Sequence, residues 1–345
     1  ELNLLWLKCN SGFFEQFFIV HCFIQCCSRP CPPEIMFLCC NQDQGCCGAK
    51  GEVGMEALKA DTASPNYDSD VKDDTIGAAD DDMLQNSTSY FDRELKELND
   101  MKARGVEVKN GQPYTFKSGA VYVGQWSKHQ RNGYGKQTWP DGSYYQGQWA
   151  DDCAVGKGRF THSDGDVYIG QWNNNMANGV GIYIHKGSTT YRGQWSMDLQ
   201  DGYGIETWVE GARYEGTFSK GQKHGFGCYH WIDGSEYSGM WEENVIGGTG
   251  SYLASDGRHF KGQWKDSVIH GVGRYEWPGG REYSGTYQGD QKHGFGIFTW
   301  PDGRVYEGFW SNGKQSGQGR YTTKDGTTRT AFWQDGRRVK DAEES

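Results

Sequence analysis

The sequence is poor in the residues that usually build a thick hydrophobic core. Hydrophobic residues make up 35% of the 345 positions and aromatic residues alone account for 14%, so aliphatic side chains are scarce. No stretch approaches the roughly 18 uninterrupted apolar residues that a membrane-spanning helix needs. Proline occurs 8 times and glycine does not recur at every third position, which excludes a collagen triple helix. Basic residues are not in excess, because the formal net charge is −10, and nonspecific nucleic-acid binding is disfavoured.

Glycine, in contrast, is abundant. It fills 51 of the 345 positions, about twice its usual share of roughly 7%. A chain rich in glycine and aromatic residues but poor in aliphatic ones is typical of an internal repeat.

Charge and cysteine are unevenly distributed. Residues 51–110 carry 15 acidic and 7 basic residues, whereas residues 111–333 carry 22 of each. Nine of the 11 cysteines precede residue 48, and the other two, Cys153 and Cys228, are too few for a disulfide framework. A reducing compartment, and hence a cytoplasmic location, is expected.

Residues 1–50 are predicted to be a cysteine-rich leader or a membrane-anchoring tail. They lack the basic start and the clean apolar run of a signal peptide, and a translated leader before a start at Met36 or Met55 is the alternative. Cysteine pairs in such a tail can accept palmitate or remain inert, whereas myristoylation is not expected because Gln44 precedes Gly45. A zinc site is not expected either, since no Cys-x-x-Cys pair is matched by a second one. The candidate lipidation sites are Cys39, Cys40, Cys46 and Cys47.

Two further segments precede the repeat. Residues 51–88 are acidic and poor in apolar residues, which predicts a disordered linker. Residues 89–110 are predicted to form an amphipathic helix and a connector, with Ser89 as N-cap and Gly105 as the end of the helix. Such a helix either caps the first repeat or binds a partner, and its apolar stripe consists of Phe91, Leu95, Leu98 and Met101.

A repeat of 23 residues begins at Tyr122 and continues through nine units without an insertion. If the first aromatic residue of each unit is position 0, glycine recurs at positions 2, 11 and 13, and a second aromatic residue at position 4. Most units end in a turn such as Pro140-Asp141-Gly142. Position 0 is occupied by Tyr122, Tyr145, Tyr168, Tyr191, Tyr214, Tyr237, Phe260, Tyr283 and Tyr306.

This spacing predicts β-strands, because side chains two residues apart point to the same face of a strand. Positions 0, 2 and 4 share a face of one strand, and positions 11, 13, 15 and 17 share a face of the next. The Pro-Asp-Gly sequence suits a type I turn closed by a glycine bulge. That turn pairs position 13 with the glycine, and position 11 with the tryptophan, of the following unit. A four-residue loop at positions 6 to 9 is expected to pair the same rows within a unit.

The predicted fold class is therefore an all-β repeat, an elongated single-layer antiparallel β-meander of about nine hairpins over residues 111–333. A half-unit at 114–119 begins it, a strand at 329–333 ends it, and residues 334–345 form a charged C-terminal tail. Each indole is expected to lie over a neighbouring glycine. The opposite face, at positions 1, 3 and 14, is expected to be polar. Local register is less certain at the displaced turn Lys186–Ser188.

The pattern Tyr-x-Gly-x-Trp, then Gly-x-Gly, then Asp-Gly resembles the MORN repeat (membrane occupation and recognition nexus). The unit beginning at Tyr306, with Trp310, Gly317, Gly319 and Asp325, illustrates it, and the resemblance covers residues 114–333. MORN arrays occur in radial-spoke head proteins of cilia, in junctophilins at membrane junctions, in parasite cytoskeletal scaffolds, and beside catalytic domains of lipid kinases and a lysine methyltransferase. The resemblance implies a scaffold attached to a cytoskeletal, ciliary or axonemal assembly, and residues 1–113 and 334–345 are not expected to hold such a catalytic domain.

The sequence predicts a non-enzymatic protein without catalytic residues, cofactor or metal. It contains no Walker loop, no Gly-x-Ser-x-Gly elbow and no His-Glu-x-x-His helix. Phospholipid binding, as a peripheral membrane tether, ranks second because the balanced charge of the array offers no attraction to anionic lipid. A regulatory module associated with a lipid kinase is a further alternative.

The aromatic stripe is the candidate partner-binding surface. A single-layer sheet has no second layer to cover it, so the stripe is expected to stay partly uncovered and to bind protein partners, either an amphipathic helix or a second copy of the chain. The alternative is that the stripe only stabilises the sheet. The candidate residues are Trp126, Trp149, Trp172, Trp195, Trp241, Trp264 and Trp310.

Overall fold

The structure is a computed structural model that describes residues 90–341. The predicted leader or anchoring tail, its four candidate lipidation sites (Cys39, Cys40, Cys46 and Cys47), the acidic linker and Ser89 lie outside these residues. No helix among residues 90–341 is long and apolar enough to cross a membrane.

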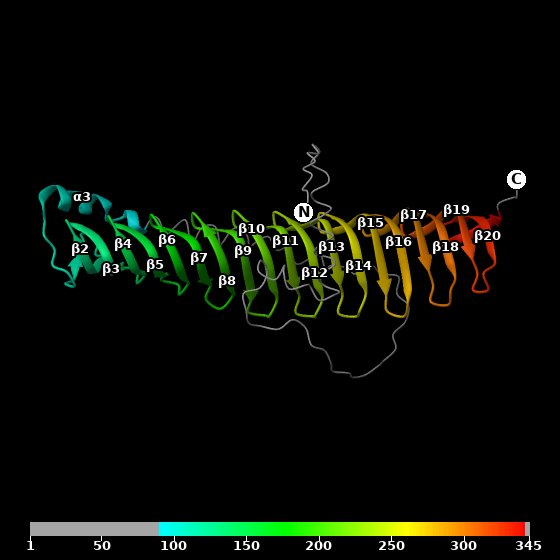
Figure 1. Cartoon of the computed structure of the whole chain (residues 1–345), viewed down its shortest axis with the longest axis horizontal. Coiled ribbons are helices and arrows are strands. Elements are labelled where there is room, and N and C mark those ends of the chain that lie inside the picture. Colours follow the sequence, from blue (N-terminus) through cyan, green and yellow to red (C-terminus); the bar gives the residue numbers. More distant parts are fainter. Residues whose placement is uncertain (1–89, 342–345) are drawn as a thin grey trace, which may run out of the picture. The chain divides into compact units, whose positions relative to one another are not determined.

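The described residues form one antiparallel sheet in which every strand pairs with the strand before it and the strand after it in the sequence. Figure 1 shows the strands following one another in order, with helix α3 (Leu95–Arg104) beside the end that carries β2 to β6. The predicted meander of MORN-like hairpins is confirmed. The strands are β1 (Tyr114–Thr115), β2 (Val121–Ser127), β3 (Gln130–Thr138), β4 (Tyr144–Ala150), β5 (Cys153–Thr161), β6 (Val167–Asn173), β7 (Met176–Ile184), β8 (Thr189–Ser196), β9 (Leu199–Trp208), β10 (Arg213–Ser219), β11 (Gln222–His230), β12 (Glu236–Glu242), β13 (Val245–Leu253), β14 (His259–Lys265), β15 (Val268–Trp277), β16 (Arg281–Gln288), β17 (Gln291–Thr299), β18 (Val305–Ser311), β19 (Lys314–Thr322), β20 (Thr328–Gln334) and β21 (Arg337–Asp341).

Between units the chain has the predicted register. Gly133 pairs with Trp149 and Gly135 with Gly147. The connecting turn is closed by a hydrogen bond of 3.0 Å from the Gly142 N–H to the Trp139 carbonyl oxygen, and Gly142 has a φ of 90°, which only glycine adopts readily. The displaced turn at 186–188 leaves this register unchanged, because Gly179 still pairs with Trp195.

Within a unit the turn differs from the prediction. Ser127 pairs with Gln130, so the loop has two residues, Lys128 and His129, with φ of 49° and 69°. Positive φ at both central residues is the signature of a type I′ hairpin turn. A bulge between Gly124 and Trp126 then accommodates two extra residues of the returning strand. The four-residue loop predicted at positions 6 to 9 is therefore wrong.

The helical segment begins before the sheet and is interrupted. Residues 90–92 are helical, Arg93 and Glu94 form a turn, and α3 follows. Gly105 ends α3 in the left-handed conformation, with a φ of 66°, as expected for a helix C-terminus.

Three of the four residues of the predicted apolar stripe, Phe91, Leu98 and Met101, are buried, and Leu95 is half-buried. They belong to the same hydrophobic cluster as the first aromatic residues of the sheet. The segment therefore packs on the array.

The sheet continues beyond the strand that was expected to end it. β21 pairs with β20 through Gln334 and Arg337. This strand lies within residues 334–345, for which a charged tail was predicted.

Candidate binding surface

The tyrosine at position 0 lies over a pair of glycines on adjacent strands. In the second unit, a Cβ atom added to Gly147 would lie 2.4 Å from Tyr145 Oη, and one added to Gly158 would lie 2.3 Å from the same atom. The hydroxyl of Tyr145 donates a hydrogen bond of 3.0 Å to the carbonyl oxygen of Gln148. Burial raises the pKa of Tyr145 well above its ordinary value of 10. The glycine pair therefore accommodates the tyrosine, and the prediction that the indole lies over a glycine is wrong.

Each indole at position 4 instead lies between two aromatic rings, both tyrosines except at Trp264, where one is Phe260. The ring of Trp149 is edge-to-face with Tyr145 of its own unit, at a centroid distance of 5.0 Å, and with Tyr122 of the preceding unit, at 5.5 Å. Edge-to-face pairs are a favourable arrangement of aromatic quadrupoles. The same alternation runs from unit to unit up to Tyr306 and Trp333, at 5.0 Å. We call these rings at positions 0 and 4 the aromatic column.

The seven candidate tryptophans lie in this column and are less accessible than expected. Trp264 is half-buried, and the other six have exposed fractions between 2% and 8%. The expectation that this stripe stays partly uncovered is therefore wrong, because the neighbouring tyrosines cover its ring faces and edges. All seven lie on even-numbered strands; they are Trp126, Trp149, Trp172, Trp195, Trp241, Trp264 and Trp310.

The glycine at position 11 has a different function from the glycines under the tyrosine. Gly156 has a φ of 61° and forms part of the bulge. The backbone N–H of the next residue, Lys157, donates a hydrogen bond of 2.8 Å to Gln148 Oε1. The glutamine at position 3 thus satisfies a donor that the bulge removes from the strand ladder.

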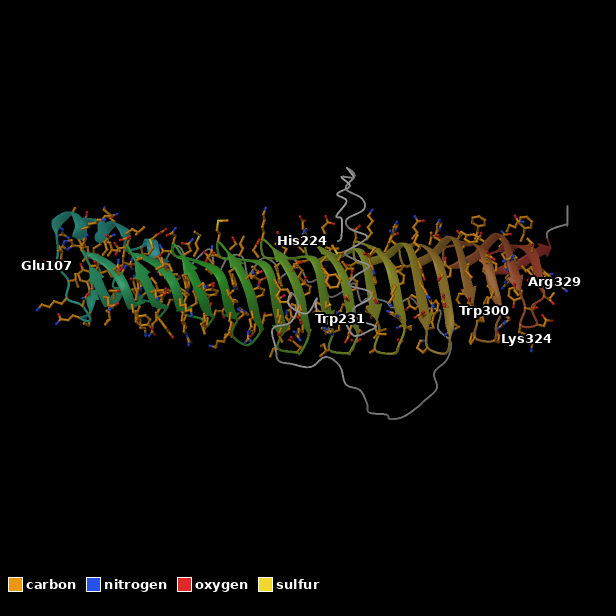
Figure 2. The ribbon with its side chains drawn as sticks, viewed as in Figure 1. Glu107, His224, Trp231, Trp300, Lys324 and Arg329 are labelled. Atoms are coloured by element: carbon orange, nitrogen blue, oxygen red, sulfur yellow. The ribbon has the colours of Figure 1, made fainter. Side chains whose placement is uncertain are left out.

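A second set of rings, at positions 15 and 17, lies on the same face as the column. Trp231 and Tyr229 have centroids 4.7 Å apart, and Phe298 and Trp300 are 4.6 Å apart. Apart from Tyr275, the rings of β9 to β19 in this set are half-buried. Figure 2 labels two of them, Trp231 and Trp300, at equivalent positions three units apart. We call this set the outer row; from β9 to β19 it consists of Trp208, Tyr229, Trp231, Tyr252, Tyr275, Trp277, Phe298, Trp300 and Tyr321.

At the N-terminal end of the array the chain covers the outer row itself. Phe91 lies within 5.5 Å of Trp139 and 6.2 Å of Phe160, measured between ring centroids. Tyr90 lies on the same two rings, at 5.1 Å and 5.5 Å. Trp139 and Phe160 are consequently buried, with exposed fractions of 2% and 6%, whereas most of their equivalents farther along the array are half-buried.

A carboxylate accompanies these rings. Glu94 is 1% exposed, and its Oε2 accepts hydrogen bonds from Trp139 Nε1 at 3.2 Å and from Gln137 Nε2 at 2.9 Å. The fully buried Arg131 lies below, 4.2 Å from the Trp149 ring centroid. Burial lowers the pKa of Arg131, and the carboxylates of Asp152 and Glu94 oppose this effect.

The cation recurs at the same position of two later units. Lys223 forms an ion pair of 2.9 Å with Glu206. Lys292 lies over Trp277, at 5.2 Å from the ring centroid, and over Trp310, at 5.4 Å. Burial lowers the pKa of Lys292, and the positive charge of Arg281 adds to the effect. Among residues 90–341, no ion pair joins Lys292 to a carboxylate.

The other face of the sheet carries exposed apolar side chains that the sequence analysis missed. They recur at position 12 of the repeat, on the face opposite the aromatic column. The polar residues at positions 1, 3 and 14 of this face were predicted from the sequence, but no prediction covered position 12. The row consists of Tyr134, Val180, Tyr203, Phe226, Val272 and Phe295.

Metal-ligand chemistry is not found on either face. No group of three or more His, Cys, Asp or Glu side chains within residues 90–341 could hold a metal ion.

The nine hairpins coincide with a known sequence family. The MORN repeat family matches residues 122–144, 145–167, 168–189, 191–213, 214–236, 237–257, 260–280, 283–303 and 306–328. These matches cover more than half of the chain, and the protein belongs to the MORN repeat family. Membership of this family indicates a scaffold or binding role.

Other comparisons are distant. No curated protein matches the chain. The TCP10 domain of CPAP from Danio rerio is 16% identical, with a TM-score of 0.27, over 60% of this chain and 98% of that domain. The SAS-4 TCP domain of Drosophila melanogaster, in complex with a proline-rich motif of Ana2, is 14% identical, with a TM-score of 0.28, over 50% of this chain and 86% of that one. Values of this size support no conclusion about function.

Proposed function

We propose that the protein is a non-catalytic scaffold that binds protein partners on the uncovered outer row. The observation that supports this proposal is the contrast along one row of rings. Trp139 and Phe160 are buried beneath Tyr90 and Phe91, whereas Trp231 and Trp300 have no such cover among residues 90–341. Exposed apolar ground of this kind marks interaction sites.

The aromatic column serves a different purpose in this proposal. Its indoles, such as Trp149, make edge-to-face contacts with tyrosines and in this way hold the hairpins together. A partner on this face therefore contacts mainly the outer row, whose rings are the more accessible.

The proposal is tested by replacing both Trp231 and Trp300 with serine in the full chain. Proteins that co-purify with wild type from its native cells, quantified by mass spectrometry, should be depleted at least tenfold with this variant. Replacement of Tyr203 and Phe295 by serine, on the opposite face, is the matched control and should leave the same partners bound. Equal recovery of all partners with the outer-row variant would refute the proposal, provided that circular dichroism shows an intact sheet.

The cellular setting is proposed by analogy with the family alone. We place the scaffold in a cytoskeletal or ciliary assembly of the radial-spoke kind, within the cytoplasm. A peripheral membrane role is the competing function, and sedimentation of the full chain with phosphoinositide-containing liposomes separates the two. Tight binding at physiological salt that survives replacement of Trp231 and Trp300 would favour the membrane.

A further inference from the structure

Phe91 occupies a pocket made of five rings from three successive units. Its ring centroid is 5.4 Å to 6.2 Å from theirs. Two rings come from the outer row and three from the aromatic column. The five are Trp139, Tyr145, Trp149, Phe160 and Trp172.

The same five rings recur seven units later, at the C-terminal end of the array. Adding seven repeats of 23 residues to each position gives five aromatic residues in the same order. They are Trp300, Tyr306, Trp310, Tyr321 and Trp333.

The geometry of the second set matches that of the first. The Trp300–Tyr321 centroid distance is 6.1 Å, where its N-terminal counterpart is 5.9 Å. Tyr306 is 5.3 Å from Trp310 and 5.0 Å from Trp333, where the counterparts are 5.0 Å and 5.1 Å. Tyr321 and Trp333 also line a surface pocket. The five rings are therefore spaced as they are around Phe91, and two of them border a surface hollow that the other three do not line.

One of the three hydrogen-bond donors to Glu94 recurs with the rings, because Gln137 and Ser118 correspond to Phe298 and Gly279. Arg131 lies near Glu94 but forms its ion pair with Asp152. Trp139, whose indole N–H donates to Glu94, corresponds to Trp300, and the cation Arg131 corresponds to Lys292. Lys292 lies over four rings, and within residues 90–341 no carboxylate forms an ion pair with it. A desolvated cation without a counter-charge favours an occupant that brings a carboxylate.

From these two correspondences we propose that the Trp300 site binds a helical segment of a partner protein that carries phenylalanine and, three residues later, glutamate. The phenyl ring enters the five-ring pocket, and the glutamate pairs with Lys292 and accepts from the Trp300 indole N–H. This inference rests on the proposed function, because it names the chemistry of the partner that the outer row receives. Phe91 and Glu94 of the chain's own N-terminal segment are the template for this Phe-x-x-Glu motif.

Two additional arginines, Arg281 and Arg304, distinguish the Trp300 site from its template. Asp302 corresponds to Asp141, the acceptor of the Tyr90 hydroxyl, but Arg304 already holds Asp302 through a bond of 2.8 Å. Ser143 is replaced by Arg304, and Ala120 by Arg281. The site is thus more basic than the template, and Asp302 is held by Arg304 where Asp141 is held by Tyr90. A more acidic external segment suits it better than the electrically balanced segment 90–104 of a second copy.

The middle of the array offers an internal comparison. Trp231 and four further rings occupy the positions that correspond to the five rings around Phe91. The cation of this set, Lys223, is already paired with Glu206 at 2.9 Å. This site therefore has less need of an external carboxylate than the Trp300 site.

The test uses a fluorescently labelled peptide of residues 91–104 with Arg93→Glu and Lys96→Glu, which keeps Phe91 and Glu94, omits Tyr90 and is acidic; it is titrated into the full chain. Saturable binding is expected, with the highest affinity at the Trp300 site. Lys292→Met in the protein, or Glu94→Gln in the peptide, should weaken binding about tenfold, as for the loss of a hydrogen-bonded charge pair. The two changes together should weaken it little further, since they remove the same contact. Phe91→Ala in the peptide should weaken binding at least tenfold.

Lys261→Met, on the opposite face, and Lys223→Met are the matched controls and should leave the affinity within about twofold. The peptide variants cannot unfold the protein, so the result does not depend on the stability of Lys292→Met. Absence of binding, or binding that is insensitive to both Lys292→Met and Glu94→Gln, overturns this inference. If the outer-row variant still loses its cellular partners in that case, the proposed function stands and only the Phe-x-x-Glu occupant is wrong. Self-association of the full chain that Lys292→Met abolishes would instead identify the occupant as a second copy, against this proposal.

Discussion

A glycine pair beneath each tyrosine is the smallest unit on which the fold depends. At Gly147 an added Cβ would approach Tyr145 Oη to 2.4 Å and the Gly158 Cα atom to 2.6 Å. The second contact involves backbone, which cannot rotate away. Elsewhere the array contains a glycine without this constraint, since Gly247 has no atom within 4 Å of the added Cβ and no positive φ.

We expect Gly147→Ala to lower the free energy of unfolding by about 2 kcal/mol, in the range for overpacking. Gly247→Ala should change it by less than about 0.5 kcal/mol, because the alanine finds open space. Urea denaturation followed by tryptophan fluorescence measures both. Similar losses for the two variants would contradict the assignment of the glycine pair to the tyrosine.

The sequence predicts the rows of residues but not which side chain fills the space above a glycine. The ring at position 0 takes that place with or without a hydroxyl, since Phe260 also lies over its glycine pair, Gly262 and Gly273. In Tyr145 the hydroxyl adds a hydrogen bond to the carbonyl oxygen of Gln148, a backbone acceptor that no period in the sequence reveals. Once the tyrosine lies there, the indole must stand against the ring edges, and it becomes buried. The seven candidate tryptophans therefore lie within the buried aromatic column rather than in the more accessible outer row.

At the scale of single elements, the N-terminal segment depends on Phe91. Its ring contacts five aromatic rings and is fully buried. Phe91→Ala should release this segment, at a cost of about 3 kcal/mol or more. Amide hydrogen exchange of Leu95–Arg104 should accelerate by at least a hundredfold, whereas Asn99→Ala on the exposed side of α3 should leave it unchanged. Unaltered protection in Phe91→Ala would show that α3 is held by other contacts.

The helix was predictable from its apolar spacing and from Gly105, but its interruption at Arg93 and Glu94 was not. Glu94 is buried and accepts a hydrogen bond from the indole N–H of Trp139, a partner 45 residues away in the sequence. The hairpin turn was missed despite an available signal. Asp151-Asp152 and Asn174-Asn175 occupy the two turn positions with positive φ, and Asn and Asp tolerate this conformation better than other non-glycine residues.

For the whole molecule, the buried tyrosines predict sensitivity to alkali. Burial raises the pKa of Tyr306 to about 12 and raises that of Tyr145 and Tyr191 further. The folded state therefore retains protons that the unfolded state releases near pH 10, and stability must fall as the pH rises above that value. Lys292, whose pKa is lowered, acts in the opposite direction but is a single group.

We expect the free energy of unfolding to be nearly constant from pH 8 to 9.5 and to fall progressively between about pH 10 and 12. Urea denaturation at each pH, together with phenolate absorbance, follows the stability and the titration on one sample. Tyr306→Phe should reduce the slope, since Phe260 occupies the same position without a hydroxyl. Unchanged stability at pH 11 would indicate that the tyrosines ionise without unfolding.

The uninterrupted repeat also sets the distance between the two later ring sets that include a cation, those of Trp231 and Trp300. Trp231 and Trp300 are three units apart, which is six strand spacings, or roughly 29 Å at about 4.8 Å each. A ligand with two motifs joined by a flexible tether of about 25 to 30 residues spans this gap on average, and its second engagement becomes intramolecular. Under the proposed function, bivalent ligands are selected by tether length as well as by motif, because hydrogen-bond geometry fixes the spacing of the sites.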